Sequence, residues 1–590
     1  MSINLSKQKR DKMLETLRKI KENIEDDETL KNLSLIEYEL TKKKYGLVWE
    51  EHEERVDKEL KTQIPTFEEI IDKKILSNPN EKFNFLLEGD NLHSLYLLEK
   101  THKGKIDFIY IDPPYNTGNK DFVYNDEYIE AENEYKHSKW LSFMEKRLQI
   151  AKRLLKPNGV IFVSIDRNEG FQLKLLMDEI FGEDALAADL HVETSVIAGP
   201  RRVPALNGSV VKTTEFILGY VNGQDKKIMK NPMYDYIQGF DTHYSCYYDE
   251  NKDELVPLLS FLKQNDMVVS AFESMNLKLS LNNLGKVIYS NEKVKKWLYS
   301  DPISSHIFRK GDDDIKIPNE IVSKIKKETV RTYNNQIFTI NAQGKTKSVF
   351  CYRDRIGECD DYYLSYGERT IRGNLWKGFS ADGGNLAKEG GIAFKNGKKP
   401  KRLIKQLIKS CLGNKDNAII LDFFAGSGTT AQAVLELNDE DNLHRNFILC
   451  TNNENNICQN VTYKRLLNIN YGKENCKKIR FNLAYYKTSF VPRLNDDEEN
   501  IQENLLFNIK NLIQLENGID IDNKKIRVIL SEKEVDDFSI KENEVLECEK
   551  LYLSSDILLT AKQTKIFKEN NIEVFIIPEY YFDEEIKEVL

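Results

Sequence analysis

Short apolar segments separated by helical stretches most constrain the fold of this chain. Runs such as IDFIYI and VIFVSI do not alternate polar and apolar residues, which favours strands covered on both faces of a sheet. Helix-patterned segments lie between some of them, at 140–155 and 170–181. This order predicts an α/β fold with an open sheet. We expect strands at 106–111, 160–165, 216–220, 419–424 and 447–450.

The regular pattern is interrupted between residues 222 and 384. This stretch is rich in Asn, Tyr, Lys and Asp and has no steady period, which predicts an insert with its own fold. Near the start, Met13, Leu17, Ile20 and Ile24 form one apolar stripe of a packing or dimerising helix. We predict a helical region at 1–75, two halves of an α/β core at 76–221 and 385–494, the insert at 222–384, and a C-terminal α+β domain at 501–590.

Charge and cysteine content bound the protein class. The chain has 86 Lys and Arg against 95 Asp and Glu, a net charge of −9, so only a local basic cleft would favour nucleic acid. The eight cysteines include no C-x-x-C pair and the histidines have no ligand spacing, so we expect no metal site. No apolar run approaches the roughly 18 residues of a membrane span. We therefore expect a reduced, cytoplasmic protein.

The first candidate site is Asp112-Pro113-Pro114-Tyr115, which directly follows the strand predicted at 106–111. In an open α/β sheet, ligands bind beyond the carboxyl ends of the strands. Two successive prolines remove two backbone donors, so this stretch presents carbonyl oxygens, and the Asp112 carboxylate adds another acceptor. A planar amino group fits these acceptors, and Tyr115 offers a ring for stacking. The motif favours an exocyclic amine of a nucleobase; a rigid Pro-Pro turn is the alternative.

The second candidate site is a glycine-containing turn, DFFAGSGTT at 422–430, between a predicted strand and a predicted helix. Gly426 and Gly428 allow a tight turn and the close approach of a ligand to a helix N-terminus. This context indicates a nucleotide-like cofactor, although the third glycine of a dinucleotide fingerprint is absent. An acidic side chain about twenty to thirty residues further on is expected to bind ribose hydroxyls, and Glu454 is the best candidate. An unliganded glycine turn is the alternative.

Together, DPPY and FAGSGT resemble the motifs of S-adenosylmethionine-dependent DNA amino-methyltransferases, in the permuted order of the β class. The chain most resembles the modification (Mod) subunits of type III restriction-modification systems. This resemblance implies a Rossmann-like methyltransferase core, with the catalytic half before and the cofactor-binding half after an inserted target-recognition domain. The supporting stretches are LEGDNLHSL at 87–95, WLSFMEKRLQIAKRLLKPNGVIFVSIDRNE at 140–169, the segment 399–407, KTSFVP at 487–492 and PEYYFDEE at 578–585.

The resemblance also implies roles for single residues. Asp112 and the Pro113 carbonyl would accept hydrogen bonds from adenine N6, within a catalytic motif completed by Pro114 and Tyr115. Tyr115 would stack on an extruded base. Asp90 would meet the adenine amine of the cofactor S-adenosylmethionine, and Glu454 its ribose. The glycine loop would bind the rest of the cofactor through Asp422, Phe423, Ala425, Gly426, Ser427 and Gly428.

The partners implied by the resemblance are double-stranded DNA, a second copy of the chain and an ATP-dependent restriction (Res) subunit. Gly344-Lys345-Thr346 has Thr339 where a Walker A motif has its first glycine, so ATP hydrolysis would need another polypeptide. The alternatives are a stand-alone adenine or cytosine-N4 DNA methyltransferase and a non-catalytic DNA-recognition subunit. Methylation of RNA or of a glutamine amide is disfavoured by Asp112 and by the motif order. Phosphate contacts or simple solvation would explain Arg201, Arg202 and the group Lys395, Lys398, Lys399, Lys401 and Arg402.

Overall fold

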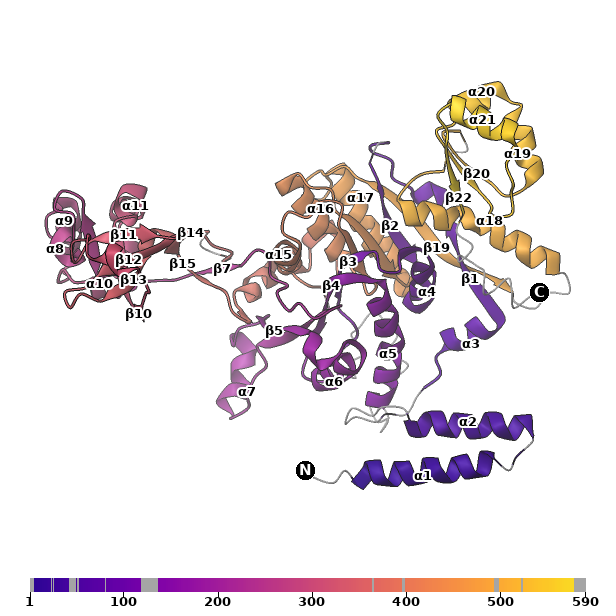
Figure 1. Ribbon diagram of the computed structural model, residues 1–590, viewed down its shortest axis with the longest axis horizontal. Coiled ribbons are helices and arrows are strands. Elements are labelled where there is room, and N and C mark those ends of the chain that lie inside the picture. The colour runs from indigo at the N-terminus through magenta and orange to yellow at the C-terminus, as the bar shows by residue number, and fades with distance from the viewer. Residues whose placement is uncertain are drawn as a thin grey trace.

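A computed structural model describes residues 5–577, except for 23, 25, 42–48, 50–51, 80, 118–135, 363–364, 395–397, 493–497 and 522–523. The chain forms a broad α/β core, an insert that projects from one side of it, and smaller units at its two ends (Figure 1). The predicted α/β class is confirmed. The segment at 578–585 and Lys395 lie outside the described residues.

A ten-stranded mixed sheet forms the core, in the order β1-β19-β2-β18-β17-β3-β4-β6-β5-β16. The strands from β19 to β4 run parallel to one another. Strand β6 runs antiparallel to both of its neighbours. The five predicted strands are all present, as β3, β4, β6, β17 and β18. The bounds are β1 Gln63–Glu69, β2 Phe83–Glu88, β3 Ile106–Ile111, β4 Leu155–Ile165, β5 Leu186–Glu193, β6 Thr214–Val221, β16 Leu375–Trp376, β17 Ile419–Asp422, β18 Asn446–Thr451 and β19 Asn482–Pro492.

Helices cover both faces of this sheet, which explains the lack of alternation in its central strands. Every side chain of β2 and of β3 is buried. Three helices pack in succession on one face and three more lie on the other (Figure 1). The helices predicted at 140–155 and 170–181 are α5 and α6. The bounds are α4 Asn91–His102, α5 Lys136–Leu154 and α6 Gly170–Phe181, then α15 Lys401–Leu412, α16 Thr429–Asp441 and α17 Lys464–Tyr471.

The direction of the strand order reverses between β17 and β3. From β17 the chain continues through α16 to β18 on one side, whereas from β3 it continues through α5 to β4 on the other. The two central strands are hydrogen-bonded in parallel, with Leu421 opposite Ile109. Such a reversal leaves a crevice at the carboxyl ends of the two strands, where open α/β sheets bind their ligands.

The insert is built from short elements around its own apolar core (Figure 1). A six-stranded sheet has the order β11-β12-β13-β10-β8-β9, and a three-stranded sheet has the order β14-β15-β7. The chain then returns to the main sheet, where β16 pairs with β5. The strands are β7 Tyr234–Tyr236, β8 Cys246–Asp249, β9 Glu254–Pro257, β10 Ile307–Asp314, β11 Val330–Tyr333, β12 Gln336–Ile340, β13 Thr346–Cys351, β14 Ile356–Glu358 and β15 Tyr366–Ile371. The larger helices are α9 Asp266–Ser274, α10 Leu281–Ser290 and α11 Glu292–Tyr299.

The two ends of the chain add helices and a small sheet. Helices α1 (Leu5–Lys21) and α2 (Asp27–Thr41) lie side by side, and α3 (Arg55–Thr62) leads into β1 (Figure 1). Helix α18 (Glu498–Asn517) packs on β1 and α4. The last unit is a parallel three-stranded sheet of β20 (Ile526–Ile529), β21 (Lys550–Leu553) and β22 (Glu573–Ile576). Among the described helices, none is long and apolar enough to cross a membrane.

Candidate active site

The structure brings the two sequence motifs together at the reversal point of the sheet. Strand β3 ends immediately before Asp112, and β17 ends at Asp422. Because the two strands are parallel neighbours, DPPY and the glycine loop leave the same edge side by side. The fold therefore joins two motifs that lie far apart in the sequence.

The Asp112 carboxylate belongs to a compact cluster of four polar groups. The Tyr115 hydroxyl donates to Asp112 Oδ1 at 2.8 Å. The Lys399 ammonium lies 3.3 Å from the same oxygen and donates to the Tyr115 hydroxyl at 2.6 Å. It also donates to Glu215 Oε2 at 2.7 Å. One ammonium thus satisfies two carboxylates and a phenol.

Burial and these neighbours set the protonation of the cluster. Burial raises the pKa of Asp112 above its ordinary value, although the Lys399 ammonium opposes the rise. Burial would also raise the pKa of Glu215, but Lys399 and Lys212 bring it below its ordinary value. The two carboxylates outweigh the burial of Lys399 and raise the pKa of its ammonium. The cluster at neutral pH therefore holds a charged lysine between two acceptors.

The DPPY backbone leaves one carbonyl for a ligand. Trp140 Nε1 donates to the Pro114 carbonyl at 2.8 Å, which fixes the end of the motif. Among the described residues, no side chain or backbone group donates to the Pro113 carbonyl. The Tyr115 ring is only 6% exposed, and Lys399 Nζ lies 4.8 Å from its centroid. The Lys399 ammonium therefore lies over one face of the Tyr115 ring.

The glycine loop has the geometry of a cofactor cradle. Gly426 and Gly428 have φ values of 47° and 74°, in the left-handed region that favours glycine. Gly428 precedes the 13-residue helix α16, so free backbone N–H groups lie at this helix end. Among the other predicted loop residues, Phe423 is fully buried, and Ala425 and Ser427 are each 6% exposed. The site fits a ligand laid along the backbone rather than against the Phe423 ring.

Asp422 shapes this loop from within. One carboxylate oxygen accepts a hydrogen bond from Phe424 N at 3.0 Å, and the other accepts from Thr430 Oγ1 at 2.5 Å. Its side chain is buried, and burial raises its pKa to about 7 even though both hydrogen bonds oppose the rise. Asp422 therefore lies under the loop and stabilises its conformation through these two hydrogen bonds.

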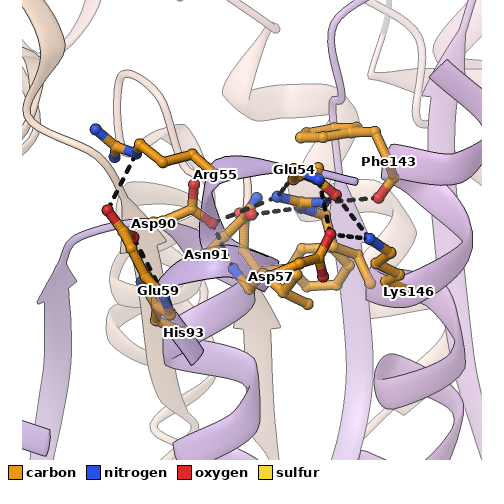
Figure 2. Close-up of polar contacts among 12 residues, drawn as sticks. Glu54, Arg55, Asp57, Glu59, Asp90, Asn91, His93, Phe143 and Lys146 are labelled. Atoms are coloured by element: carbon orange, nitrogen blue, oxygen red, sulfur yellow. Dashed lines mark hydrogen bonds and ion pairs between the residues drawn. The ribbon is translucent and has the colours of Figure 1, made fainter. Parts of the chain in front are cut away.

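Asp90 lies beside the glycine loop in a polar network (Figure 2). Its carboxylate caps α4 by accepting from Leu92 N at 2.8 Å, and its side chain is 30% exposed. The next residue, Asn91, donates to the Phe423 carbonyl at 2.8 Å and accepts from Arg147 Nε at 2.6 Å. Arg147 is fully buried and forms a bidentate pair with Glu54, at 2.9 and 3.0 Å. A helix of the N-terminal region thereby supports the wall of the cofactor site.

Glu454 lies in a short turn, Glu454–Asn456, which follows β18. Its side chain is exposed, and it stands at the carboxyl edge of the strand between β2 and β17. Asp90, Glu454 and the glycine loop therefore leave three neighbouring strands at one edge. The structure also places Glu88 at this edge; it is buried and accepts a hydrogen bond from Tyr485, a role that the sequence analysis did not identify.

The described members of the basic group at 395–402 make their polar contacts within the protein. Lys399 points into the Asp112 cluster, and Lys398 is buried and donates to three carbonyls, those of Ala387, Glu389 and Ile392. Lys401 and Arg402 pair with Glu436 and Asp382. Neither explanation given above holds for Lys398 and Lys399, whose side chains are largely buried; Lys401 and Arg402 are partly exposed in ion pairs, and Lys395 lies outside the described residues. No motif pointed to Glu215, which reaches the site because β6 runs antiparallel to its neighbours.

The chain is similar to known proteins over the region that contains both motifs. A family model described as DNA methylase matches residues 106–462. The probable type III restriction-modification enzyme HindVI Mod subunit of Haemophilus influenzae is 34% identical over 60% of this chain and 47% of its own length. The StyLTI Mod subunit of Salmonella typhimurium is 28% identical over 65% and 54%. The type II methyltransferase M.KpnI of Klebsiella pneumoniae is 28% identical over 64% and 82%. The chain thus spans about half the length of the first two relatives.

Proposed function

Because this chain belongs to the DNA methylase family, we propose that it transfers a methyl group from S-adenosylmethionine to adenine N6 in double-stranded DNA. The observation that carries the proposal is the meeting of Asp112 and the glycine loop at neighbouring strand ends. An acceptor for an amine and a cradle for a nucleotide-like donor then share one crevice.

The Asp112 carboxylate and the Pro113 carbonyl accept the two N–H groups of the target amine. These hydrogen bonds hold the amine nitrogen with its lone pair directed toward the glycine loop. As the new N–C bond forms and the S–C bond breaks, the amine loses one proton, and the Asp112 carboxylate is placed to accept it. The amine lies inside the base stack of a duplex, so the base must be extruded to reach this pocket.

S-adenosylmethionine supplies an electrophilic methyl group on a sulfonium when it is bound. The chain offers three groups for it, at the ends of neighbouring strands: the loop at Gly426 and Gly428, the Asp90 carboxylate and the Glu454 carboxylate. The Asp90 side chain is 30% exposed, and the hydrogen bond from Asn91 to the Phe423 carbonyl holds this segment next to the loop. We therefore propose these three groups as the binding site for S-adenosylmethionine.

We further propose that the chain is the modification and recognition subunit of a type III system, a homodimer that binds a separate ATP-dependent Res subunit. The Mod subunits among its relatives support this proposal. The insert at 222–384 has its own core, which projects from the α/β core (Figure 1), and is the proposed target-recognition domain. The stand-alone enzyme is a second candidate, because M.KpnI is matched over 82% of its length.

Long-read sequencing of DNA from cells that express the chain tests the proposal. We expect N6-methyladenine in one sequence context, and none with Asp112→Asn. Modified cytosine would contradict the choice of base, and unmodified DNA would contradict the activity. Light scattering of the purified chain distinguishes the assemblies: a dimer has twice the 68.7 kDa chain mass. A fully active monomer would favour the stand-alone enzyme.

A further inference from the structure

The segment between β5 and β6 forms a loop at the rim of the candidate active site. Strand β5 ends at Glu193 and β6 begins at Thr214, and both ends lie at the edge from which Asp112 emerges. Backbone hydrogen bonds from Thr194 N and Ser195 N to the Thr213 carbonyl close the neck of the loop, at 3.0 and 3.2 Å. Figure 1 shows its short helix α7 (Arg202–Leu206) projecting away from the sheet beyond β5.

Five apolar side chains of this loop are exposed. Val203 is 58% exposed, Leu206 is 76% exposed and Val210 is 95% exposed, and Val196 and Ile197 are also about half exposed. None of these residues belongs to a described apolar core. Exposed apolar residues gathered on one small projection indicate a surface that another molecule covers.

The charge of the loop identifies the class of that molecule. Residues 196–211 contain Arg201 and Arg202 and no acidic residue, although the chain as a whole carries a net charge of −9. Within the described part of the chain, neither arginine forms an ion pair or a side-chain hydrogen bond. Cationic side chains next to apolar ones are the combination with which proteins contact phosphates and enter a base stack.

Polar contacts connect the base of the loop to the Asp112 cluster. Lys212 pairs with Asp166 at 3.0 Å and lies 3.7 Å from Glu215. Glu215 in turn accepts the hydrogen bond from Lys399 beside Asp112. A duplex that delivers a base to Asp112 must therefore pass next to this loop.

We propose that the 194–213 loop is a DNA wedge. Val203 and Leu206 enter the duplex beside the extruded adenine, where they fill the space that the base leaves, and Arg201 and Arg202 contact the flanking phosphates. This inference rests on the proposed function, because it requires a base to leave a duplex. The apolar side chains replace lost base stacking with buried apolar contact, so the wedge stabilises the extruded state.

Two double variants and two matched controls test the wedge. The apolar variant is Val203→Ser with Leu206→Ser, and its control is Leu558→Ser, a change at a residue 82% exposed on the C-terminal unit. The charge variant is Arg201→Ala with Arg202→Ala, and its control is Lys562→Ala with Lys565→Ala, both on exposed positions of α21 (Ala561–Glu569). The substrate is a duplex with the methylated sequence found by sequencing, with 2-aminopurine at the target for fluorescence.

We expect the apolar variant to lose about tenfold in kcat/KM and most of the fluorescence rise. A target adenine placed opposite an abasic site should restore its rate to within about twofold of the wild type, because an unpaired base is extruded at little cost. The charge variant should bind more weakly, and its plot of log Kd against log salt should lose about two from its slope. Both controls should match the wild type.

Other results overturn the wedge. The first is an apolar variant with the wild-type rate and fluorescence rise. The second is an apolar variant whose loss in kcat/KM is the same for a paired and an unpaired target adenine. The third is a variant that changes the mass measured by light scattering but leaves DNA binding unchanged. The last result would assign the loop to a subunit interface. If the wild-type chain methylates no duplex, the proposed function fails and the wedge fails with it; if it methylates normally, the variants decide on the wedge alone.

Discussion

The ammonium of Lys399 lies 3.3 Å from Oδ1 of Asp112, so the proposed acceptor for the target amine already faces a cation. The Lys399 ammonium opposes the rise that burial causes in the pKa of Asp112, and it contacts the same carboxylate oxygen that accepts a hydrogen bond from Tyr115. Lys399 is thereby a positioning residue, which acts through Asp112.

Replacing Lys399 with Met should shift the pH dependence of methyl transfer. Burial raises the pKa of Asp112, and the Lys399 ammonium opposes that rise. Without the cation the pKa rises further, so the acid limb of the kcat/KM profile should move to higher pH, by roughly one unit. Lys399→Arg retains the positive charge, so it should move the acid limb of the kcat/KM profile less. An acid limb that does not move in Lys399→Met would contradict the role of the ion pair.

Replacing Asp112 with Asn should remove the proton acceptor while keeping the shape of the pocket. We expect kcat to fall on the order of 10²-fold or more, with DNA affinity retained, because the lost interaction acts chiefly in the transition state. Single-turnover methyl transfer and fluorescence anisotropy measure the two quantities. Asp184→Asn, at a fully exposed side chain, is the control and should be fully active. Near-normal turnover in Asp112→Asn would reject the proposed role.

Replacing Asp422 with Asn should change how stability depends on pH. The folded-state pKa of Asp422 is about 7 against an ordinary value of 3.8, so the folded chain binds a proton that the unfolded chain releases. The wild-type free energy of unfolding should therefore fall as pH rises from about 4 to 7. An amide cannot ionise; its oxygen can still accept from Phe424 N, and its nitrogen can donate to Thr430 Oγ1 in place of the bond that Thr430 donated. Its core should melt a few degrees higher than the wild type at pH 8 and at the same temperature near pH 4, as measured by calorimetry. If the melting temperatures of the wild type and of Asp422→Asn changed with pH in the same way, the proposed titration of Asp422 would be wrong.

Replacing Arg147 with Met should destabilise the core, because the buried Glu54 carboxylate loses its bidentate partner and is left with the Lys146 ammonium at 3.9 Å. Breaking a buried pair costs about 3–5 kcal/mol, or roughly 10 °C in melting temperature for a unit of this size. Affinity for S-adenosylmethionine should also fall, since Asn91 loses the guanidinium that orients it. Glu54→Gln in the same chain should recover most of the stability.

The control for Arg147 lies on the same helix. Arg153 pairs with Glu99 at the surface, with 42% and 23% of the two side chains exposed. Arg153→Met should change stability by no more than about 1 kcal/mol. An equal loss in the two variants would mean that burial of the Arg147 pair has no special importance.

The sequence predicted the centre of the fold well. Strands such as IDFIYI are buried on both faces, and this burial leaves a readable run of apolar residues. The match to the DNA methylase family and to Mod subunits confirms the predicted resemblance. Five strands of the ten-stranded sheet were not predicted. Two are the edge strands, of which β16 has only two residues and β1 begins with Gln63, and the others are the inner strands β2, β5 and β19. The insert had no readable period because many of its elements have fewer than seven residues.

The site residues that could be predicted are those that lie together in one short motif. DPPY and the glycine loop each follow a strand, so their place at one edge could be deduced. Lys399 and Glu215 could not be assigned, because their roles depend on contacts between distant segments. The side chains of Lys398 and Lys399 are also largely buried, whereas clustered lysines usually face water.

The strand order has a consequence for synthesis of the chain on the ribosome. Strand β2 lies between β19 and β18, and β3 lies beside β17, so strands made early interleave with strands made late. Nearly 200 residues separate the end of β6 at Val221 from the start of β17 at Ile419. At about 5–20 residues per second, the nascent sheet has unpaired edges for on the order of 10–40 s. The insert, whose sheets contain only its own strands, can fold in that interval, before the core that holds it.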